Sequence, residues 1–334
     1  MRILKFCKVI GCTFLLFSSL IAKADDNILE YDGKKMKLQD LPVAAQQSLF
    51  DVEYRSYLSK KQTLEADVLL EMYAAEEAKK SGKSVDEFKK NLLKVPDSTD
   101  KEAQAFFDKN KARIPYPFDK VKDEIKRLVA REKEETKRTE VIDMIKKKKK
   151  VKINIEEPIA PVIKIETVDF ASKGKVGAKV QIVEFADYQC PHCQHAAQTL
   201  KPVIEKYKDQ IHFVYVDFPI NPSGISRLVA RGAQCAGQQN KFWEFHYMAF
   251  DKQQTLGTAS SEEFAKALKL DEAKFKECYS SKWSEELVEK GRKEGERIGV
   301  SGTPSIFING RRYSGAHEGA EFISAIEKEL KASS

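Results

Sequence analysis

The chain has 334 residues, of which 58 are Lys or Arg and 51 are Asp or Glu, so its formal net charge is +7. A nucleic-acid-binding protein usually concentrates its positive charge on one face. This chain balances the two signs too closely for that, so we expect no nucleic-acid partner. Its length indicates two domains.

The amino terminus has the form of a cleaved secretory signal peptide. A basic start is followed by an apolar run over about residues 9–22 and by small residues, so we expect cleavage after segment 1–24. A permanent membrane anchor would need about 20 apolar residues, whereas this run is shorter and contains Ser18 and Ser19. Segment 1–24 holds four positive charges and no negative ones, so the mature chain would have a formal charge of +3.

Four cysteines remain in the mature chain, namely Cys190, Cys193, Cys235 and Cys278. An even number fits an exported protein, because disulfides persist in oxidising compartments. Cys190 and Cys193 form a close pair of their own. We therefore predict a structural disulfide between Cys235 and Cys278, which are left over and lie in the same predicted helical region.

Residues 25–150 are predicted to form a separate helical domain. Apolar residues recur at helical spacing over about 41–80. Ser84 and Thr99 each begin a capping-box pattern, in which a hydroxyl and a carboxylate bind the free amides at a helix start. Two short helices should begin at these positions.

A long helix is predicted over about residues 118–147, and it would extend roughly 45 Å at 1.5 Å per residue. Both of its ends carry apolar stripes, whereas residues 131–140 are almost entirely charged. A helix with such a polar centre is expected to bridge packed bodies or to line an open surface. The lysine run 146–150 can indicate anionic partners, but lysines in a last turn also complement the helix dipole, and we favour the second interpretation.

Residues 151–165 are predicted to be an extended linker, because Pro158 and Pro161 interrupt an alternating apolar pattern. Residues 166–334 then follow an α/β pattern. The expected elements are a strand over 180–185, a helix over 190–208, a strand over 211–218, a helical insertion over about 222–298, a hairpin over 305–313 and a closing helix over 318–331.

The motif Cys190-Pro191-His192-Cys193 opens the first of these helices and is suited to redox chemistry. Its spacing lets the two sulfurs close a small ring across the first turn. The helix dipole and nearby positive charge can lower a cysteine pKa from about 8.5 to roughly 3.5–7.5, and His192 adds a donor or charge. Since the thiolate is the attacking species, Cys190 is the predicted nucleophile and Cys193 the resolving thiol.

A zinc site is the alternative interpretation of this motif, since the same spacing occurs in metal-ligand pairs. A structural zinc site needs a second pair of ligands, and Cys235 and Cys278 lie far apart in the sequence. We therefore predict neither a metal nor an organic cofactor.

Several separated motifs of the second half resemble the DsbA-type branch of the thioredoxin superfamily. They are the strand Gln181–Ala186, the Cys-Pro-His-Cys motif, Cys235–Gly237, Lys241–His246, Val300–Ser305 and Phe307–Gly310. The resemblance covers roughly residues 160–332. It implies a protein thiol-disulfide oxidoreductase with a thioredoxin fold and a helical insertion, preceded here by a separate all-α domain.

The resemblance also implies roles for three residues outside the motif. Pro304 would be the cis-proline that faces the active-site disulfide, with Thr303 before it. The backbone there would pair with an extended client and keep metal away from the sulfurs. Glu184 matches the buried acid beneath the disulfide and would shuttle the proton of Cys193; the alternative is a surface acid at a strand edge.

Members of this branch act in either of two directions. Oxidases donate disulfides and are reoxidised by a quinone-linked membrane enzyme, whereas isomerases and reductases receive electrons from a membrane donor. The Cys-Pro-His-Cys motif favours the oxidase, while Thr303 and the extra domain leave the isomerase open. The implied partners are unfolded or reduced secreted proteins and one such membrane redox partner, and the implied location is the periplasm or another exported site.

The first half also resembles the helical chaperone portion of SurA-type proteins, through residues 64–79, 83–87 and 109–114. No segment like a parvulin isomerase domain follows. The resemblance therefore implies client holding or formation of a homodimer through this domain, and a plain spacer is the alternative. A rival hypothesis for the whole chain is a periplasmic chaperone-adaptor whose thioredoxin domain mainly binds clients.

Overall fold

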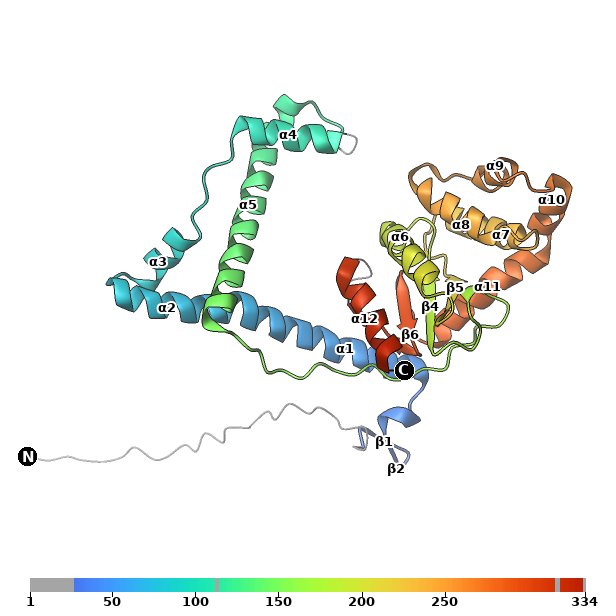
Figure 1. Cartoon of the computed structure of the whole chain (residues 1–334), viewed down its shortest axis with the longest axis horizontal. Helices are drawn as coiled ribbons and strands as arrows, with labels where there is room; N and C mark the ends of the chain where they lie inside the picture. Colours follow the sequence, from blue (N-terminus) through green and yellow to red (C-terminus); the bar gives the residue numbers. More distant parts are fainter. Residues whose placement is uncertain (1–26, 112–113, 316–318, 333–334) are drawn as a thin grey trace, which may run out of the picture. The chain divides into compact units, whose positions relative to one another are not determined.

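The structure is a computed structural model that describes residues 27–111, 114–315 and 319–332. The predicted signal peptide, residues 1–24, lies outside the described residues. Two compact units share the chain (Figure 1): one spans Asp51–Ile159, and the other joins the described residues up to Phe50 with those from Ala160 onward. Among the described residues, no helix is both long and apolar enough to cross a membrane.

The unit of residues 51–159 is built from helices. They are the end of α1 (Val43–Gln62), a π-helical turn (Thr63–Val68), α2 (Leu69–Ser81), α3 (Val85–Leu92), α4 (Asp100–Asn110) and α5 (Phe118–Lys149). The two predicted helix starts are confirmed. The Glu87 N–H donates to Ser84 Oγ, and the Glu102 N–H donates to Thr99 Oγ1, both at 3.2 Å.

Helix α5 bridges two separate apolar clusters, as its sequence predicts (Figure 1). Near its end, Val141 and Ile145 pack against α2. Near its start, Ile125 and Val129 pack against α4. The charged centre stays at the surface and makes ion pairs, of which Lys133 with Glu102 at 3.0 Å is one.

The second unit contains a five-stranded sheet in the order β3-β5-β4-β6-β7. Its strands are β3 (Ala171–Gly174), β4 (Val180–Ala186), β5 (Ile211–Asp217), β6 (Ser305–Ile308) and β7 (Arg311–Arg312). The central strands β4 and β5 are parallel, whereas β6 runs antiparallel to β4. In this register Glu184 of β4 lies between Tyr215 of β5 and Ile306 of β6.

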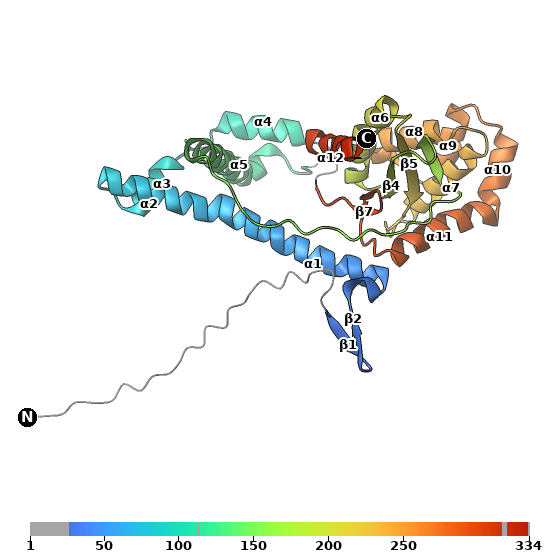
Figure 2. The same ribbon diagram turned by 60° about the horizontal axis from the view of Figure 1, so that its bottom comes forward.

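Helices cover both faces of this sheet, and in Figure 2 α6 and α11 lie on opposite sides of it. The helices of the unit are α6 (Pro191–Lys206), α7 (Ile225–Gly237), α8 (Phe242–Asp251), α9 (Ser260–Ala267), α10 (Glu272–Ser280), α11 (Lys282–Arg297) and α12 (Gly319–Ala332). One apolar core joins α6, the insertion and α12 to the sheet, and a smaller core lies under α11. This is the thioredoxin-type α/β fold with a helical insertion.

The amino-terminal boundary of the units differs from the predicted domain 25–150. Residues up to Phe50 group with the sheet unit, because Val43 at the start of α1 packs against the core under α11. This part also contains a hairpin of β1 (Leu29–Tyr31) and β2 (Lys34–Met36), where helix alone was expected. The Asp-Gly pair between these strands, with both residues at positive φ, is a hairpin signal that the helical interpretation passed over.

Candidate active site

The end of β4 and the start of α6 present the two cysteines differently. Cys190 is the N-cap of α6, and Pro191 follows at the first helical position, where a missing N–H costs nothing. Cys193 lies in the first turn and is 0 % exposed, whereas Cys190 is half-buried; in this structure both are free thiols. A client sulfur can therefore reach Cys190 but not Cys193.

The surroundings of Cys190 favour its thiolate. A hydrogen bond from the Cys193 thiol is the largest cause, and partial burial opposes it. The Thr303 side chain and then the backbone N–H groups of Cys193 and His192 act in the same direction as the Cys193 thiol, and together these contacts lower the Cys190 pKa to about 5. In the thiol form Cys190 donates to the Thr303 carbonyl oxygen at 3.2 Å. At neutral pH Cys190 is thus ionised.

Burial has the opposite effect on Cys193. It raises the pKa of the Cys193 thiol far above its ordinary value, and the hydrogen bond to Cys190 and the charge of Glu184 act in the same direction. The inner cysteine therefore keeps its proton while the outer one is ionised. This asymmetry assigns attack to Cys190.

Glu184 is a fully buried residue of a central strand and not a surface acid. Its side chain is 0 % exposed, and neither carboxylate oxygen has a hydrogen-bond partner among the described residues. Burial first, and then the charge of Cys190, raise the Glu184 pKa to about 8. An acid with this pKa can release or accept a proton near neutral pH.

The other predicted site residues lie around the same sulfur, with one difference in role. The Thr303–Pro304 peptide bond is cis and directly precedes β6. His192 is exposed and reaches the Cys190 sulfur through its backbone N–H, whereas the sequence pointed to its imidazole. In the described part of the chain, no three His, Cys, Asp or Glu side chains are grouped to hold a metal.

Cys235 and Cys278 form a disulfide with an S–S distance of 2.00 Å. It joins α7 to α10 inside the helical insertion. Both residues are buried, so clients have no access to these sulfurs.

Two residues that sequence reasoning missed hold the loop before Cys190. The buried carboxylate of Asp187 accepts hydrogen bonds from this loop and from the residues that lead into α7. Gln253, from the turn that follows α8 in the middle of the insertion, donates to the carbonyl oxygens of Tyr188 and Cys190, both at 2.9 Å. The position of Asp187, between a predicted strand and the Cys-x-x-C motif, is a sequence signal that could have identified it. No local sequence pattern points to Gln253, which lies 63 residues from Cys190.

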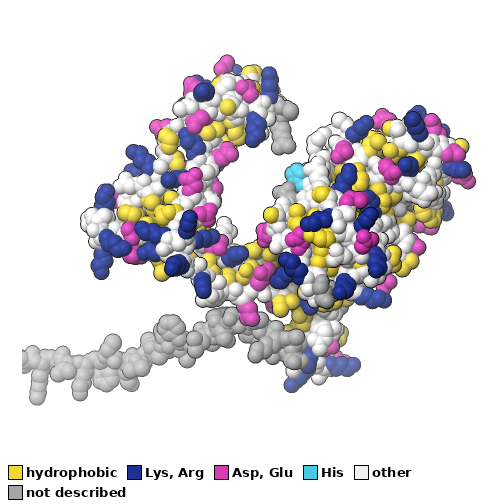
Figure 3. Space-filling view, viewed as in Figure 1, with side chains coloured by type: hydrophobic (Ala, Val, Ile, Leu, Met, Phe, Trp, Pro, Cys, Tyr) yellow, Lys and Arg dark blue, Asp and Glu magenta, His cyan; other side chains and the backbone are white. Residues whose placement is uncertain are grey.

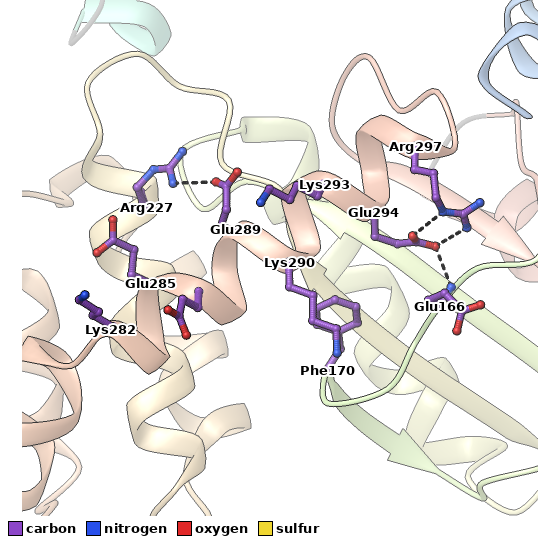
Figure 4. Close-up of a pocket in the computed structure, with 11 residues that line it drawn as sticks. Glu166, Phe170, Arg227, Lys282, Glu285, Glu289, Lys290, Lys293, Glu294 and Arg297 are labelled. Atoms are coloured by element: carbon purple, nitrogen blue, oxygen red, sulfur yellow. Dashed lines mark hydrogen bonds and ion pairs between the residues drawn. The ribbon is translucent and has the colours of Figure 1, made fainter. Parts of the chain in front are cut away.

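A charged groove of about 790 Å³ lies along α11 and is lined by neither active-site cysteine (Figure 4). Ion pairs occupy much of its wall: Arg227 contacts Glu289 at 3.3 Å, and Arg297 contacts Glu294 at 2.7 Å. The acidic and basic side chains that line the groove largely compensate each other, so its charge favours neither an anionic nor a cationic ligand.

Comparison with known proteins gives matches that cover about half of the chain. Residues 166–328 match the family model described as Thioredoxin. Na(+)/H(+) antiporter NhaA 3 of Salinispora tropica is 29% identical over 154 residues, which are 46% of this chain and 23% of that protein. NhaA 1 of Mycolicibacterium vanbaalenii is 29% identical over 161 residues, or 46% of this chain and 26% of that protein. The chain thus spans about a quarter of the length of these curated relatives.

Solved structures are also similar to this chain. BdbD from Bacillus subtilis is 26% identical with a TM-score of 0.47, covering 52% of this chain and 100% of that chain. Alpha-DsbA1 of Wolbachia pipientis is 17% identical with a TM-score of 0.46, covering 51% of this chain and 94% of that chain. The strand order, the cysteine pair at the start of α6 and the family match all fall on the same residues, so residues 166–328 have a thioredoxin-type fold and are similar in sequence to that family.

Proposed function

We propose that this protein is an exported thiol-disulfide oxidoreductase that donates disulfides to secreted proteins. One observation carries the proposal: a half-buried Cys190 whose pKa is lowered to about 5 lies beside a fully buried Cys193 that keeps its proton. Such a pair suits dithiol-disulfide exchange, because one sulfur is accessible and a good leaving group while the other is shielded from competing reactions.

The proposed exchange begins with the Cys190–Cys193 disulfide and a reduced client. A client thiolate attacks Cys190 Sγ, the bond between the two cysteines breaks, and its electron pair passes to the Cys193 sulfur, which takes a proton from Glu184. A second client thiolate then attacks the client sulfur of this mixed disulfide, and Cys190 leaves as a thiolate. Two client thiols become one disulfide, and the protein gains two electrons.

The lowered Cys190 pKa supports the oxidising direction. A low-pKa thiolate leaves readily, and its stabilisation in the reduced form makes the disulfide form the better oxidant. An isomerase or reductase, the alternative, would instead be kept reduced. The redox state of Cys190 and Cys193 in cells distinguishes the two: mostly oxidised protein supports the oxidase, and mostly reduced protein supports the alternative.

The oxidase cycle requires an acceptor for the two electrons. We propose a quinone-linked membrane reoxidase in this role, and export through the signal peptide to bring the protein to it. For an isomerase the corresponding partner would be a membrane electron donor.

We propose further that the unit of residues 51–159 holds unfolded clients or a second copy of the chain. In Figure 3 apolar side chains of this unit lie at the surface among charged ones. Its exposed large apolar residues include Val52, Leu58, Val68, Met72, Leu128 and Met144. Met72 is 66% exposed and Val52 56%. Deleting the domain should spare oxidation of a small dithiol peptide but slow oxidative folding of a large client. Equal rates on both substrates would make this domain a spacer.

Oxidation of a reduced dithiol peptide by the full chain tests the enzymatic proposal. Cys190→Ala should abolish turnover. Cys193→Ala should also abolish turnover, because no disulfide can then form within the motif. Given a client that already contains a disulfide, the Cys190 thiolate of this variant should attack one client sulfur, release the other as a thiolate and accumulate the mixed disulfide, because the resolving sulfur is absent. Turnover that survives in Cys190→Ala would remove the enzyme and leave the chaperone-adaptor.

A further inference from the structure

Asp187 sits at the end of β4 with its side chain 2 % exposed and four donors around it. One carboxylate oxygen, Oδ1, accepts from the Gln189 N–H at 2.7 Å and from the Ser226 hydroxyl. The other, Oδ2, accepts from the Ile220 N–H at 2.8 Å and the Asn221 N–H at 3.0 Å. The carboxylate therefore ties the loop before the nucleophile to the segment that enters α7.

The backbone of Asp187 touches both active-site cysteines. Its carbonyl oxygen accepts from the Cys190 N–H at 3.0 Å. Its own N–H donates toward the Cys193 sulfur. One residue thus contacts the peptide unit of the outer cysteine and the sulfur of the inner one.

Gln189 reinforces the same connection. Its side-chain oxygen accepts from the Ser223 hydroxyl at 2.7 Å and from the Ser226 N–H at 3.2 Å. The loop before Cys190 is held by this pair of side chains on one side and by Gln253 on the other. Its geometry therefore depends on specific polar contacts rather than on apolar packing alone.

We propose that Asp187 is a positioning residue that sets the reactivity of Cys190 by fixing the loop between β4 and α6. This inference rests on the proposed thiol-disulfide exchange. The thiolate of Cys190 is stabilised mainly by a hydrogen bond from Cys193, and hydrogen bonds weaken steeply with distance and angle. A loop that moves by a fraction of an ångström therefore weakens that bond.

The chemistry of the site requires a carboxylate and not an amide. All of the backbone groups that reach Asp187 side-chain oxygens are donors, and a carboxylate offers only acceptors. In Asp187→Asn one oxygen becomes an NH₂ group. In either orientation this group faces at least one backbone N–H, from Gln189 or from Ile220 and Asn221.

The test is the Asp187→Asn variant in the full chain, with two measurements on Cys190. The first is the pH midpoint of its alkylation by iodoacetamide, and the second is the equilibrium constant of the cysteine pair with glutathione. The other titratable groups beside Cys190 are Cys193, Glu184 and His192, and the variant retains all three. Loss of the Asp187 charge would by itself lower the Cys190 pKa, so a rise reports on the geometry of the loop. We expect the midpoint to rise by about one pH unit and the protein to become about tenfold less oxidising.

Two further variants separate positioning from general stability. Ser226→Ala removes one donor to Asp187 and should shift both readouts in the same direction by less. Asp271→Ala removes a carboxylate that accepts two backbone N–H groups at the start of α10, at 3.1 Å each. It should lower the melting temperature while leaving both Cys190 readouts as in wild type.

Wild-type values of both readouts in Asp187→Asn would overturn the positioning role, even with a lower melting temperature. If Asp187→Asn does not fold, unchanged readouts in Ser226→Ala overturn it instead. Failure of the proposed thiol-disulfide exchange gives a different result from failure of the positioning role. In that case the wild type itself would not equilibrate with glutathione, while the difference in alkylation midpoint between the wild type and Asp187→Asn would still test Asp187.

Discussion

Replacing Glu184 by Gln should stabilise the sheet unit, and the gain should grow as pH rises. Burial raises the Glu184 pKa to about 8 in the folded chain, against about 4.3 for an exposed Glu. Between these two values the folded state holds a proton that the unfolded state has lost. The protonated Glu184 therefore contributes to the free energy of unfolding at low pH, and this contribution is lost progressively as the pH rises toward the folded pKa.

The slope of this loss follows from the pKa alone. Each pH unit between the two pKa values costs about 1.4 kcal/mol, so the advantage of Glu184→Gln should increase by about 3 kcal/mol from pH 5 to pH 7. Above about pH 8 the advantage should level off, because the carboxyl is then ionised in both states. The buried Gln amide has its own desolvation cost, but that cost does not depend on pH.

Urea unfolding followed by tryptophan fluorescence measures this difference selectively, because both tryptophans of the chain, Trp243 and Trp283, lie in the sheet unit. The Glu184 reference and Glu184→Gln should both carry Cys190→Ala, which removes the titration of that thiol. This change also removes the smaller cause of the raised Glu184 pKa but leaves burial, the larger one, so the slope remains and the levelling off begins below pH 8. Glu321→Gln, at an exposed position of α12, serves as the matched control and should show no such slope. A stability difference that stays constant from pH 5 to pH 8 would refute the assignment of Glu184 as a buried acid of raised pKa.

Three further predictions address the nucleophile, the second disulfide and the packing of α11. Alkylation of Cys190 should reach half its maximal rate near pH 5, the value to which its pKa is lowered; a midpoint above pH 8 in stopped-flow alkylation would contradict this. Replacing Cys235 and Cys278 by Ala opens a loop of 43 residues, which should cost about 4 kcal/mol in urea unfolding by the chain-entropy relation, with active-site alkylation unchanged. Gly291→Ala would place a Cβ 2.7 Å from a backbone oxygen and should cost about 1–3 kcal/mol, whereas Gly257→Ala has open space; equal melting temperatures would contradict this.

The sequence predicts those parts of the fold whose signals are local. The helix starts at Ser84 and Thr99 and the two apolar ends of α5 can be recognised within a few residues of chain, and the structure confirms them. The reciprocal bond of the capping box is present at Thr99, whereas Ser84 makes only the N-cap bond to the Glu87 N–H. The strand Ala171–Gly174 was not predicted, because it is short and polar and is defined only by pairing with β5. The hairpin at residues 29–36 had a turn signal but too little apolar alternation to stand out.

The active site divides in the same way. The motif itself identifies Cys190 and Cys193, but a strand buried on both faces carries no alternation that would reveal the burial of Glu184. Asp187 receives bonds from residues 33, 34 and 39 positions away. Only the folded chain brings these donors together, so no local pattern could assign its partners.

The charges at Cys190 and Glu184 are coupled, and this coupling links proton transfer to electron transfer. The negative charge of the Cys190 thiolate is the second cause of the raised Glu184 pKa, after burial. When the two cysteines form a disulfide, that charge disappears and the Glu184 pKa falls. Burial still keeps this pKa above its ordinary value. Glu184 thus holds its proton less tightly when the proposed mechanism requires it to protonate Cys193. Once Cys190 is again a thiolate, its charge favours return of a proton to Glu184, which restores the acid beneath the reduced pair.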